Sequence, residues 1–408
     1  MSDDKKPAIR FKNYSDDWEQ RKLGDCLSLI TYGFTNPMED TESGPWKLTA
    51  KDIGDGYIDY STARHTSIES YKKLTNKSKP VVGDLLLTKD GTLGRTALVD
   101  TNNICINQSV ALLRCDEILS ANYLNILLKS PRYQNEMLEN AGGGTIKHIY
   151  ITKVDKMFID IPDIEEQEYI SKYFANLGNL ITLHQRKYDK LQNLKKAMLE
   201  KMFPKNGSNV PEIRFKGFTD AWEQRKLGDI ADIVGGGTPS TGNPSYWDGE
   251  IDWYAPAEIA DQIYANSSQK KITDLGYENS SAKMLPPGTV LFTSRAGIGK
   301  TAILTRKGCT NQGFQSIVPH RGELEPYFIF SRTEELKRYG ELVGAGSTFV
   351  EVSGKQMAAM ELMMPPTMRE QQTIGGFFQQ LDNLITLHQR ELEKLKNIKK
   401  AMLEKMFV

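Results

Sequence analysis

The chain has 408 residues, a hydrophobic fraction of 39% and 52 basic against 52 acidic residues, so its formal net charge is zero. This balance argues against a strongly basic protein that coats nucleic acid, although local patches of Lys and Arg suffice for phosphate contacts. The length predicts two to three domains.

Three further features describe the class of protein. No apolar run reaches the length of about 18 residues that a transmembrane helix needs. The polar N-terminus has no signal-peptide pattern. Four scattered cysteines, Cys26, Cys105, Cys115 and Cys309, show no CxxC spacing. We therefore expect no metal site and no disulfide framework, but reduced thiols in a cytoplasmic protein without a membrane partner.

The first segment beyond the polar residues 1–8 returns later in the chain. Residues 9–25 and 213–229 match at 13 of 17 positions, at an offset of 204 residues. The shared aromatic and leucine residues are expected to pack in a core, because aromatic side chains bury large areas. These residues are Phe11, Trp18 and Leu23 with their counterparts Phe215, Trp222 and Leu227.

Between the repeated segments, residues 26–165 and 230–369 share only short islands. One island pairs residues 85–99 with 290–304, and another pairs 141–153 with 343–355. Short apolar runs bounded by Gly, Asn, Asp and Pro predict strands. Residues 122–141 and 326–344 are predicted as helices. Each variable region is therefore expected to be a mixed α+β domain of ordinary size, about 140 residues.

Each variable region is followed by a long predicted helix. Residues 166–204 and 370–408 match at 25 of 39 positions. Proline precedes each helix, and a Glu-Gln pair lies in its first turn, where a carboxylate favours the helix dipole.

Apolar residues recur along both helices with alternating spacings of four and three, the pattern of a helix that packs along another helix. We expect Leu194 to cover the place where Lys195 breaks this pattern. The spacing does not decide between parallel and antiparallel pairing. The predicted helix-pairing residues are Leu177, Ile181, His184, Tyr188, Leu191, Met198, Leu381, Ile385, His388, Leu392, Leu395 and Met402.

Two motifs resemble catalytic signatures but lack essential parts. Residues 297–301, Gly-Ile-Gly-Lys-Thr, resemble the end of a phosphate-binding loop, yet Ser294 stands where the motif requires glycine. Residues 243–246, Asn-Pro-Ser-Tyr, resemble an element of amino-group methyltransferases without its second proline. Neither nucleotide hydrolysis nor methylation by this chain alone is predicted.

Taken together, the motifs resemble those of the DNA-specificity subunit of type I restriction-modification systems. The resemblance rests on paired W-E-x-x-K-L-G-D openings, paired glycine loops that end in Arg95-Thr96 or Lys300-Thr301, and P-x-x-x-E-Q before each helix. Residues 235–240, 246–247 and 251–253 also match the opening of the family's domains. The first half departs there, at residues 32–37 and at Trp46.

The resemblance implies two mixed α/β target-recognition domains in a pseudo-two-fold repeat, with two long helices that pair as an antiparallel coiled coil. It implies an N-terminal repeated segment at 1–25, recognition domains at 26–165 and 230–369, long helices at 166–204 and 370–408, and a linker with the second repeated segment at 205–229.

The resemblance also implies partners. Each domain would read one half of a split double-stranded DNA target, and the helices would dock two modification (methyltransferase) subunits and, through them, restriction subunits. The chain itself would not be catalytic. S-adenosylmethionine, ATP and Mg would belong to its partners.

Base reading favours Arg for guanine and Asn or Gln for adenine. We therefore predict DNA contacts from polar loop residues in each half. The Asn107-Gln108 and Asn311-Gln312 pairs recur in domains that read different bases, so they are predicted to be structural. The predicted DNA-binding residues are Lys47, Lys51, Lys89, Arg95, Lys147, His148, Thr238, Ser240, Arg295, Lys300, Thr348 and Lys355.

Two alternatives belong to other classes of protein. The chain could be a stand-alone DNA-modifying or nucleotide-using enzyme, which binding of S-adenosylmethionine or ATP by the purified chain would favour. It could also be a structural coiled-coil scaffold, but that leaves the divergence of the variable regions without a reason.

Overall fold

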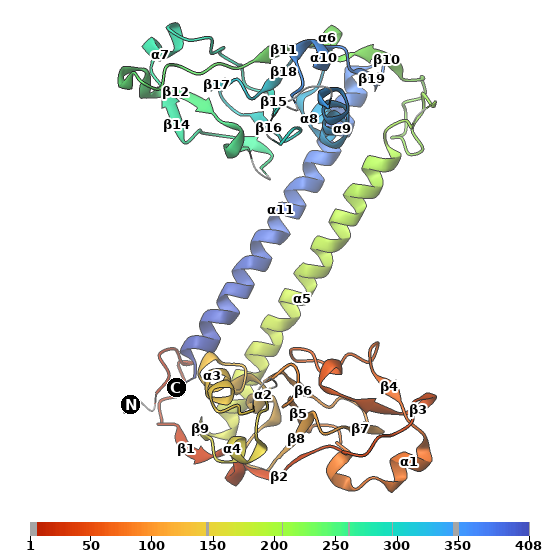
Figure 1. The fold of residues 1–408 in the computed structure, drawn as a ribbon, viewed down its shortest axis with the longest axis vertical. Coiled ribbons are helices and arrows are strands. Elements are labelled where there is room, and N and C mark those ends of the chain that lie inside the picture. Colours follow the sequence, from red (N-terminus) through yellow and green to blue (C-terminus); the bar gives the residue numbers. More distant parts are fainter. Residues whose placement is uncertain are drawn as a thin grey trace. The chain divides into compact units, whose positions relative to one another are not determined.

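The computed structural model describes residues 6–143, 147–205, 207–259, 262–295, 297–345 and 351–407. The chain divides into two compact units: unit 1 comprises Met1–Gln185 with Arg390–Val408, and unit 2 comprises Arg186–Gln389. Two helices of 38 residues, α5 (Ile164–Lys201) and α11 (Met368–Lys405), contribute to both units. Each unit thus contains the start of one long helix and the end of the other (Figure 1).

Unit 1 contains short strands and helices between its repeated opening and α5. Its strands are β1 (Glu19–Lys22), β2 (Leu27–Tyr32), β3 (Thr41–Leu48), β4 (Arg64–His65), β5 (Leu85–Thr88), β6 (Thr96–Leu98), β7 (Ile104–Ile106), β8 (Val110–Cys115) and β9 (Phe158–Ile161). Its shorter helices are α1 (Ile68–Lys73), α2 (Ala121–Leu127), α3 (Pro131–Glu139) and α4 (Ile151–Asp155), with 3-10 turns η1 (Leu23–Cys26), η2 (Ala50–Asp52) and η3 (Asn76–Ser78).

Unit 2 repeats this order. Its strands are β10 (Glu223–Lys226), β11 (Ala231–Gly235), β12 (Trp247–Tyr254), β13 (Tyr264–Ala265), β14 (Lys270–Ile272), β15 (Val290–Phe292), β16 (Thr301–Leu304), β17 (Cys309–Thr310), β18 (Gln315–Pro319) and β19 (Glu361–Met364). Its shorter helices are α6 (Leu227–Ile230), α7 (Asp274–Glu278), α8 (Pro326–Ser331), α9 (Thr333–Gly344) and α10 (Gly354–Ala358), with 3-10 turns η4 (Pro244–Tyr246) and η5 (Pro256–Glu258).

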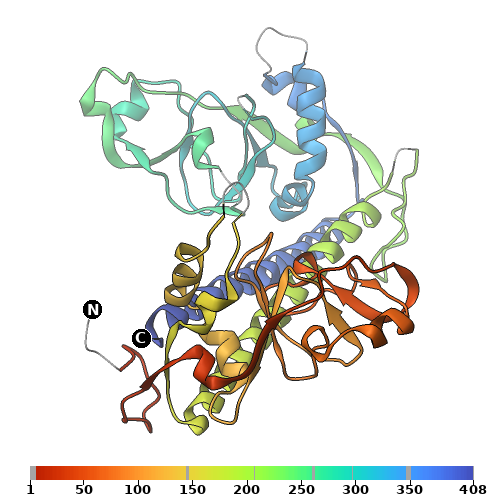
Figure 2. The same cartoon turned by 60° about the horizontal axis from the view of Figure 1, so that its bottom comes forward.

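The sheets of the two units correspond, except that unit 2 has an additional strand, β13, at the edge of its central sheet. Unit 1 has a β1-β9 ribbon, a four-stranded sheet in the order β2-β8-β5-β6, and a three-stranded sheet in the order β4-β3-β7. Unit 2 has a β10-β19 ribbon, a sheet in the order β11-β18-β15-β16-β13, and a sheet in the order β14-β12-β17. The mixed α/β content and the internal repeat predicted from the sequence are confirmed (Figure 1 and Figure 2).

The central sheet of each unit is buried on both faces, because side chains alternate along a strand. In unit 1, Leu85 and Leu87 of β5 pack in the cluster that contains α2 and α3, while Leu86 packs in the cluster that contains β3 and β7. In unit 2, Val290 and Phe292 of β15 face α8 and α9, and Leu291 lies in the opposite cluster. Near-continuous apolar strands are expected in such a layered arrangement.

The repeated opening closes each core, as the sequence predicts. Trp18 and Leu23 in unit 1, and Trp222 and Leu227 in unit 2, are buried. Phe11 and Phe215 pack against the same cores while remaining partly exposed.

The long helices meet these cores by their ends. Phe407, just beyond α11, contacts Phe174 of α5 in unit 1 at a ring-centroid distance of 6.2 Å. In unit 2, Lys195 of α5 pairs with Asp382 of α11 at 2.6 Å, and Phe203 stacks on Phe378 at 6.0 Å. Because the later residue of the first segment contacts the earlier residue of α11, the two segments run in opposite directions in unit 2.

The predicted helix-pairing positions are buried or half-buried, and their pairing with one another stays a prediction. Leu177, Leu381 and Leu392 are buried, and the other nine are half-buried. Leu191 and Met198 pack against the core of unit 2, and Met402 packs against the core of unit 1. The expectation for Leu194 is wrong, because this side chain is 39% exposed. Lys195 is accommodated instead by its ion pair with the buried carboxylate of Asp382 in α11.

The Glu-Gln pair at the start of each long helix ties three segments together. Arg10 donates to Glu166 from Nε and Nη2 at 2.8 and 2.7 Å, and Arg214 donates likewise to Glu370 at 2.7 and 2.8 Å. These hydrogen bonds raise the pKa of both guanidinium groups. Gln167 accepts from Ser120 N at 2.8 Å, at the start of α2. The opening, the long helix and the domain between them are thereby joined.

Two predicted helices are each divided in two, which corrects the expectation for residues 122–141 and 326–344. The first is interrupted at Ser130, because Pro131 lacks an amide hydrogen and disfavours helical geometry in the residue before it. The second is interrupted at Arg332, whose buried guanidinium donates to Met363 O at 2.8 Å and pairs with Glu335.

The Arg10→Ala variant should destabilise unit 1 by about 3–5 kcal/mol, because it leaves the fully buried carboxylate of Glu166 without its charged partner. Urea denaturation of the full chain measures this loss. The control is Lys73→Ala, which removes an exposed pair with Glu69 and should cost less than about 0.5 kcal/mol. Equal losses in the two variants would contradict the assigned role of Glu166.

Candidate nucleic-acid interface

A glycine hairpin joins two neighbouring strands of the central sheet in each unit, β5 to β6 and β15 to β16, with matching hydrogen bonds at its base. In unit 1, Thr88 N donates to Arg95 O at 2.9 Å, and Arg95 N donates to the Thr88 hydroxyl at 2.9 Å. In unit 2, the corresponding bonds join Thr293 and Lys300 at 3.0 and 2.9 Å. The side chains of Arg95 and Lys300 are exposed at equivalent places on these hairpins.

Glycines allow these turns. Gly91 and Gly94 have φ of 79° and 77°, and Gly297 and Gly299 have φ of 107° and 96°. Side chains rarely adopt this left-handed region. Gly94 and Gly299 are equivalent, so both hairpins have a left-handed residue directly before the exposed cation Arg95 or Lys300.

A second segment of unit 1 lies beside its hairpin. Ile149 N donates to Lys89 O at 2.8 Å, and Asp90 forms an isolated β-bridge with His148. The Asp90 carboxylate lies 2.6 Å from His148 Nδ1 and 2.7 Å from Lys89 Nζ. The Lys89 ammonium also lies over the Tyr32 ring, 5.5 Å from its centroid. We call the surface formed by this hairpin and the segments beside it the rim of unit 1. It includes Lys89, Arg95, Lys147 and His148.

The end of β2 and the turn after β7 complete this rim. A Cβ on Gly33 would stand 1.8 Å from Ile106 O, so the chain passes closely enough there to require glycine. Lys89 N donates to Ser109 O at 2.9 Å. Ala50 N donates to the Ser109 hydroxyl at 2.9 Å. This bond holds η2, which carries exposed Lys51, beside the turn after β7.

Unit 2 builds its rim from the corresponding segments. A Cβ on Gly236 would stand 2.0 Å from Asn311 O, so Gly236 corresponds to Gly33 although the sequences differ around them. Ser294 N donates to Gly313 O at 2.8 Å. The Thr238 hydroxyl donates to the side chain of Gln312. Arg295 Nε stands 3.5 Å from where a Cβ on Gly313 would lie, so Arg295 crosses the same turn.

The repeated Asn-Gln pairs divide into two roles. The side chain of Asn107 accepts from Ser109 N at 3.0 Å, and that of Asn311 accepts from Gly313 N at 2.8 Å. The asparagines therefore hold the turn, as the sequence predicts. The glutamines are different: Gln108 is exposed, and Gln312 contacts the candidate residue Thr238.

The three remaining DNA-binding candidates of unit 2 are Ser240, Lys355 and Thr348. Ser240 is exposed, and its carbonyl accepts from Trp247 Nε1 at 3.2 Å. Lys355 is exposed in the first turn of α10. Thr348 lies outside the described residues.

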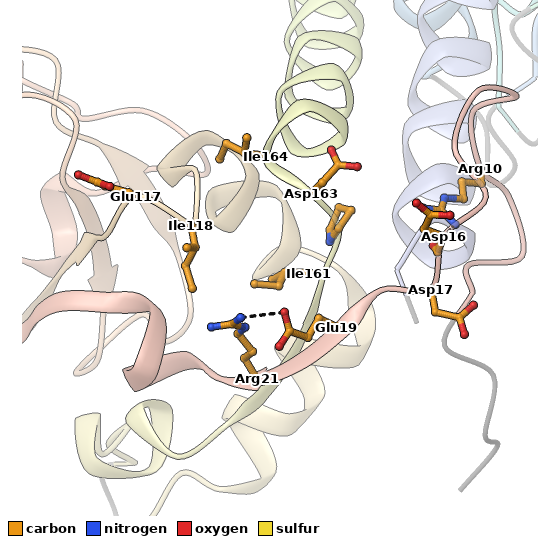
Figure 3. Close-up of a pocket in the computed structure, with 11 residues that line it drawn as sticks. Arg10, Asp16, Asp17, Glu19, Arg21, Glu117, Ile118, Ile161, Asp163 and Ile164 are labelled. Atoms are coloured by element: carbon orange, nitrogen blue, oxygen red, sulfur yellow. Dashed lines mark hydrogen bonds and ion pairs between the residues drawn. The ribbon is translucent and has the colours of Figure 1, made fainter.

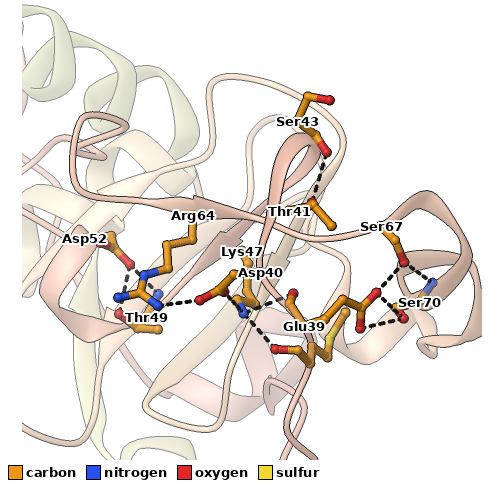
Figure 4. Close-up of polar contacts among 11 residues, drawn as sticks. Glu39, Asp40, Thr41, Ser43, Lys47, Thr49, Asp52, Arg64, Ser67 and Ser70 are labelled. Atoms are coloured by element: carbon orange, nitrogen blue, oxygen red, sulfur yellow. Dashed lines mark hydrogen bonds and ion pairs between the residues drawn. The ribbon is translucent and has the colours of Figure 1, made fainter.

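Lys47 is held inside its domain, as Figure 4 shows. Its ammonium donates to Met38 O at 2.9 Å and to Asp40, and its side chain is 12% exposed. The neighbouring Glu39 accepts from the hydroxyls of Ser67 and Ser70, and these hydrogen bonds lower the pKa of Glu39 to about 2. The geometry assigns Lys47 to this polar network, and its contact with DNA stays a prediction.

An open pocket at the start of α5 has the wrong charge for nucleic acid (Figure 3). Its two arginines, Arg10 and Arg21, pair with Glu166 and Glu19. Phosphate would meet a surplus of carboxylates there. The acidic residues that line it are Asp16, Asp17, Glu19, Glu117 and Asp163.

The near-miss catalytic motifs have ordinary structural roles. Lys300 lies in a hairpin between two strands, whereas a phosphate-binding loop places its lysine at the start of a helix. The side chain of Asn243 accepts from Ser245 N at 3.1 Å and caps η4. Over the described parts of the chain, no three His, Cys, Asp or Glu residues gather as a metal site would require. No helix there combines the length and apolar character needed to cross a bilayer.

Sequence reasoning missed the acidic members of both rims. Asp90 contacts His148, and Glu351 forms an isolated β-bridge with Arg295. The available signal was the shared island at 85–99 and 290–304, which aligns Asp90 with Arg295.

The Lys47→Met variant should destabilise unit 1 by about 1–2 kcal/mol, because it removes hydrogen bonds made by a charged group. The Lys51→Met variant alters an exposed side chain and should change stability by less than about 0.5 kcal/mol. Thermal unfolding of both full-length variants measures the difference. A silent Lys47→Met variant would contradict a structural role.

A known protein family matches each half of the internal repeat. The family model described as "Type I restriction modification DNA specificity domain" matches the chain twice, over residues 15–193 and 219–397. The MjaIX specificity subunit of a type I restriction enzyme from Methanocaldococcus jannaschii is 34% identical over 190 residues, which cover 46% of this chain and 44% of that protein.

Two further similar proteins extend over nearly the whole chain. The putative MjaX specificity subunit from the same organism is 23% identical over 401 residues, covering 95% of this chain and 92% of that protein. The crystal structure of the type I restriction-modification S subunit from M. genitalium has a TM-score of 0.64 at 16% identity and covers 99% of both chains. This likeness shows a shared fold.

Proposed function

The chain belongs to the family defined by the type I restriction modification DNA specificity domain, and on that premise we propose that it is the DNA-sequence specificity subunit of such a complex. Each recognition domain reads one half of an asymmetric, bipartite target in double-stranded DNA. The observation that carries this proposal is the pair of rims, which share one backbone geometry but present different side chains.

The rims suit two kinds of contact. Arg95 and Lys300 are cations at equivalent places, and cations common to both readers fit phosphates, which carry no sequence information. The other candidate side chains differ between the rims, and differing side chains fit base edges. A purely structural scaffold gives no reason for this division.

The long helices fit the role of a spacer. Their covered faces and their opposed directions in unit 2 support pairing as an antiparallel coiled coil. In two-fold DNA-binding proteins, readers bind half-sites about 34–36 Å apart on one face of the duplex. The length of the helices would then set the distance between the two half-sites.

A repeated apolar surface on the helices supports docking of partner subunits. Leu180 and Leu183 of unit 1 are each 46% exposed, and their equivalents Leu384 and Leu387 of unit 2 are 43% and 53% exposed. Exposed apolar residues that recur at equivalent positions are typical of interaction sites. Two modification subunits would each take one copy, and restriction subunits would join through them.

Chemistry would then belong to the partners. S-adenosylmethionine, ATP and Mg would bind the modification and restriction subunits, while this chain supplies recognition alone. All four cysteines are free thiols, which supports action in the reducing cytoplasm, where the DNA target lies.

Removal of a phosphate-contacting cation should weaken binding uniformly. In the complex with modification subunits, Arg95→Ala and Lys300→Ala should each lower affinity on every target duplex and reduce the slope of log K against log salt by about 1. Fluorescence anisotropy over a salt series measures both quantities. The control variant Lys156→Ala removes an exposed lysine far from the rim and should leave the slope unchanged. Its neighbour Met157 accepts at its carbonyl from Leu23 N, at the end of β2 opposite the rim. A sequence-dependent loss in Arg95→Ala would contradict the phosphate assignment.

Exchange of one recognition domain should change one half-site only. Residues 26–165 are replaced by the domain of another specificity subunit, and the chain is co-expressed with its modification subunits. Sequencing of the methylated genome should show one altered half-site beside one unaltered half-site. A change in both half-sites would contradict the two-reader arrangement.

A further inference from the structure

The backbone hydrogen bonds of the two rims correspond to each other. Lys89 N donates to Ser109 O in unit 1, as Ser294 N donates to Gly313 O in unit 2. Lys89 O accepts from Ile149 N at 2.8 Å, as Ser294 O accepts from Val352 N at 3.0 Å. The residues next to these bonds are therefore equivalent: one pair of positions in each unit forms an isolated β-bridge.

That bridge carries different chemistry in the two units. In unit 1 it joins Asp90 to His148, and in unit 2 it joins Arg295 to Glu351. An acid thus stands on the hairpin of unit 1 where a base stands on the hairpin of unit 2. The backbone hydrogen bonds of Lys89 and Ser294 beside the bridge correspond, and the nearby positions Arg95 and Lys300 are both cationic.

We propose that this bridge holds the specificity-determining pair of each recognition domain, with one side chain reading a base and the other positioning it. The inference rests on the proposed function and names the residues through which each domain selects its half-site. A pair that only stabilised the rim would not need opposite charges on the two hairpins.

In unit 1, His148 is the reader and Asp90 is the positioning residue. The side chain of His148 is 42% exposed, and its Nδ1 lies 2.6 Å from the carboxylate. Because Nδ1 faces the Asp90 carboxylate, Nε2 is the ring nitrogen left to meet a base edge in the major groove. Unit 1 should therefore discriminate between bases at the contacted position.

In unit 2, we assign Arg295 as the reader, and Glu351, which stands opposite it across the backbone bridge, as the residue that positions it. A guanidinium donates to O6 and N7 of guanine in the commonest specific contact with a base. Arg295 crosses the turn that contains Gln312, which already contacts Thr238. The second half-site should therefore contain a guanine whose replacement weakens binding more than replacement of its neighbours.

The test exchanges the chemistry of the bridge within unit 1. The full chain with Asp90→Arg and His148→Glu is co-expressed with its modification subunits, and the methylated motif is sequenced. We expect one or two base pairs to change in one half-site, while the half-site read by unit 2 stays the same. An unchanged motif with methylation retained would overturn the inference.

A second measurement decides the case in which the double variant gives no methylation. The complex that carries His148→Gln binds a set of duplexes in which each base pair of the target is replaced in turn. Discrimination at one position should fall by roughly 5- to 150-fold, the effect of losing one specific base contact. Unaltered discrimination at every position would overturn the inference.

Two controls separate this inference from its premise. The Arg95→Ala complex should lose affinity on all duplexes alike, without any change in discrimination. The unaltered chain should itself methylate a bipartite motif in the complex. If it does not, the proposed function fails. If it does and the bridge variants read the same motif, only the assignment of the bridge fails.

Discussion

The buried pair of an arginine and a glutamate at the start of each long helix is the interaction on which the architecture depends. Arg10 and Glu166 in unit 1, and Arg214 and Glu370 in unit 2, are separated by 156 residues in both cases. A buried carboxylate is costly without a charged partner. The pair therefore fixes where the helix begins relative to the opening segment, and in unit 2 Trp222 Nε1 also donates to Glu370 at 3.2 Å.

From this anchor the structure separates what is repeated from what varies. The adjacent glutamines bind the loop and helix that follow the central sheet, so each recognition domain is attached to its long helix in the same way. The rims lie at the other end of the β-strands from these attachments, beyond Tyr32 in unit 1 and Gly235 in unit 2. Side chains on a rim can differ without disturbing the attachment, which is the property that a reader of exchangeable specificity needs.

Sequence reasoning succeeded where the signal is local or periodic. The buried aromatic residues of the openings follow from residue type, and buried and half-buried positions recur along the long helices at the predicted spacing. It failed where one side chain or one proline overrides a pattern. Pro131 ends a helix that the apolar residues favour, and Lys195 takes a seam position by pairing with Asp382. Lys47 looks like a free cation in the sequence, but carbonyl groups and Asp40 surround its ammonium.

The sequence by itself determined the duplication, the two variable domains and the helices that follow them, because repeats and periodicity are visible along one chain. Only the tertiary structure decided which side chains meet on each rim. Asp90 and His148 are 58 residues apart, and no spacing rule relates an acid on a hairpin to a histidine on a later loop. Their contact, like the bridge between Arg295 and Glu351, depends on backbone hydrogen bonds between segments that only folding brings together.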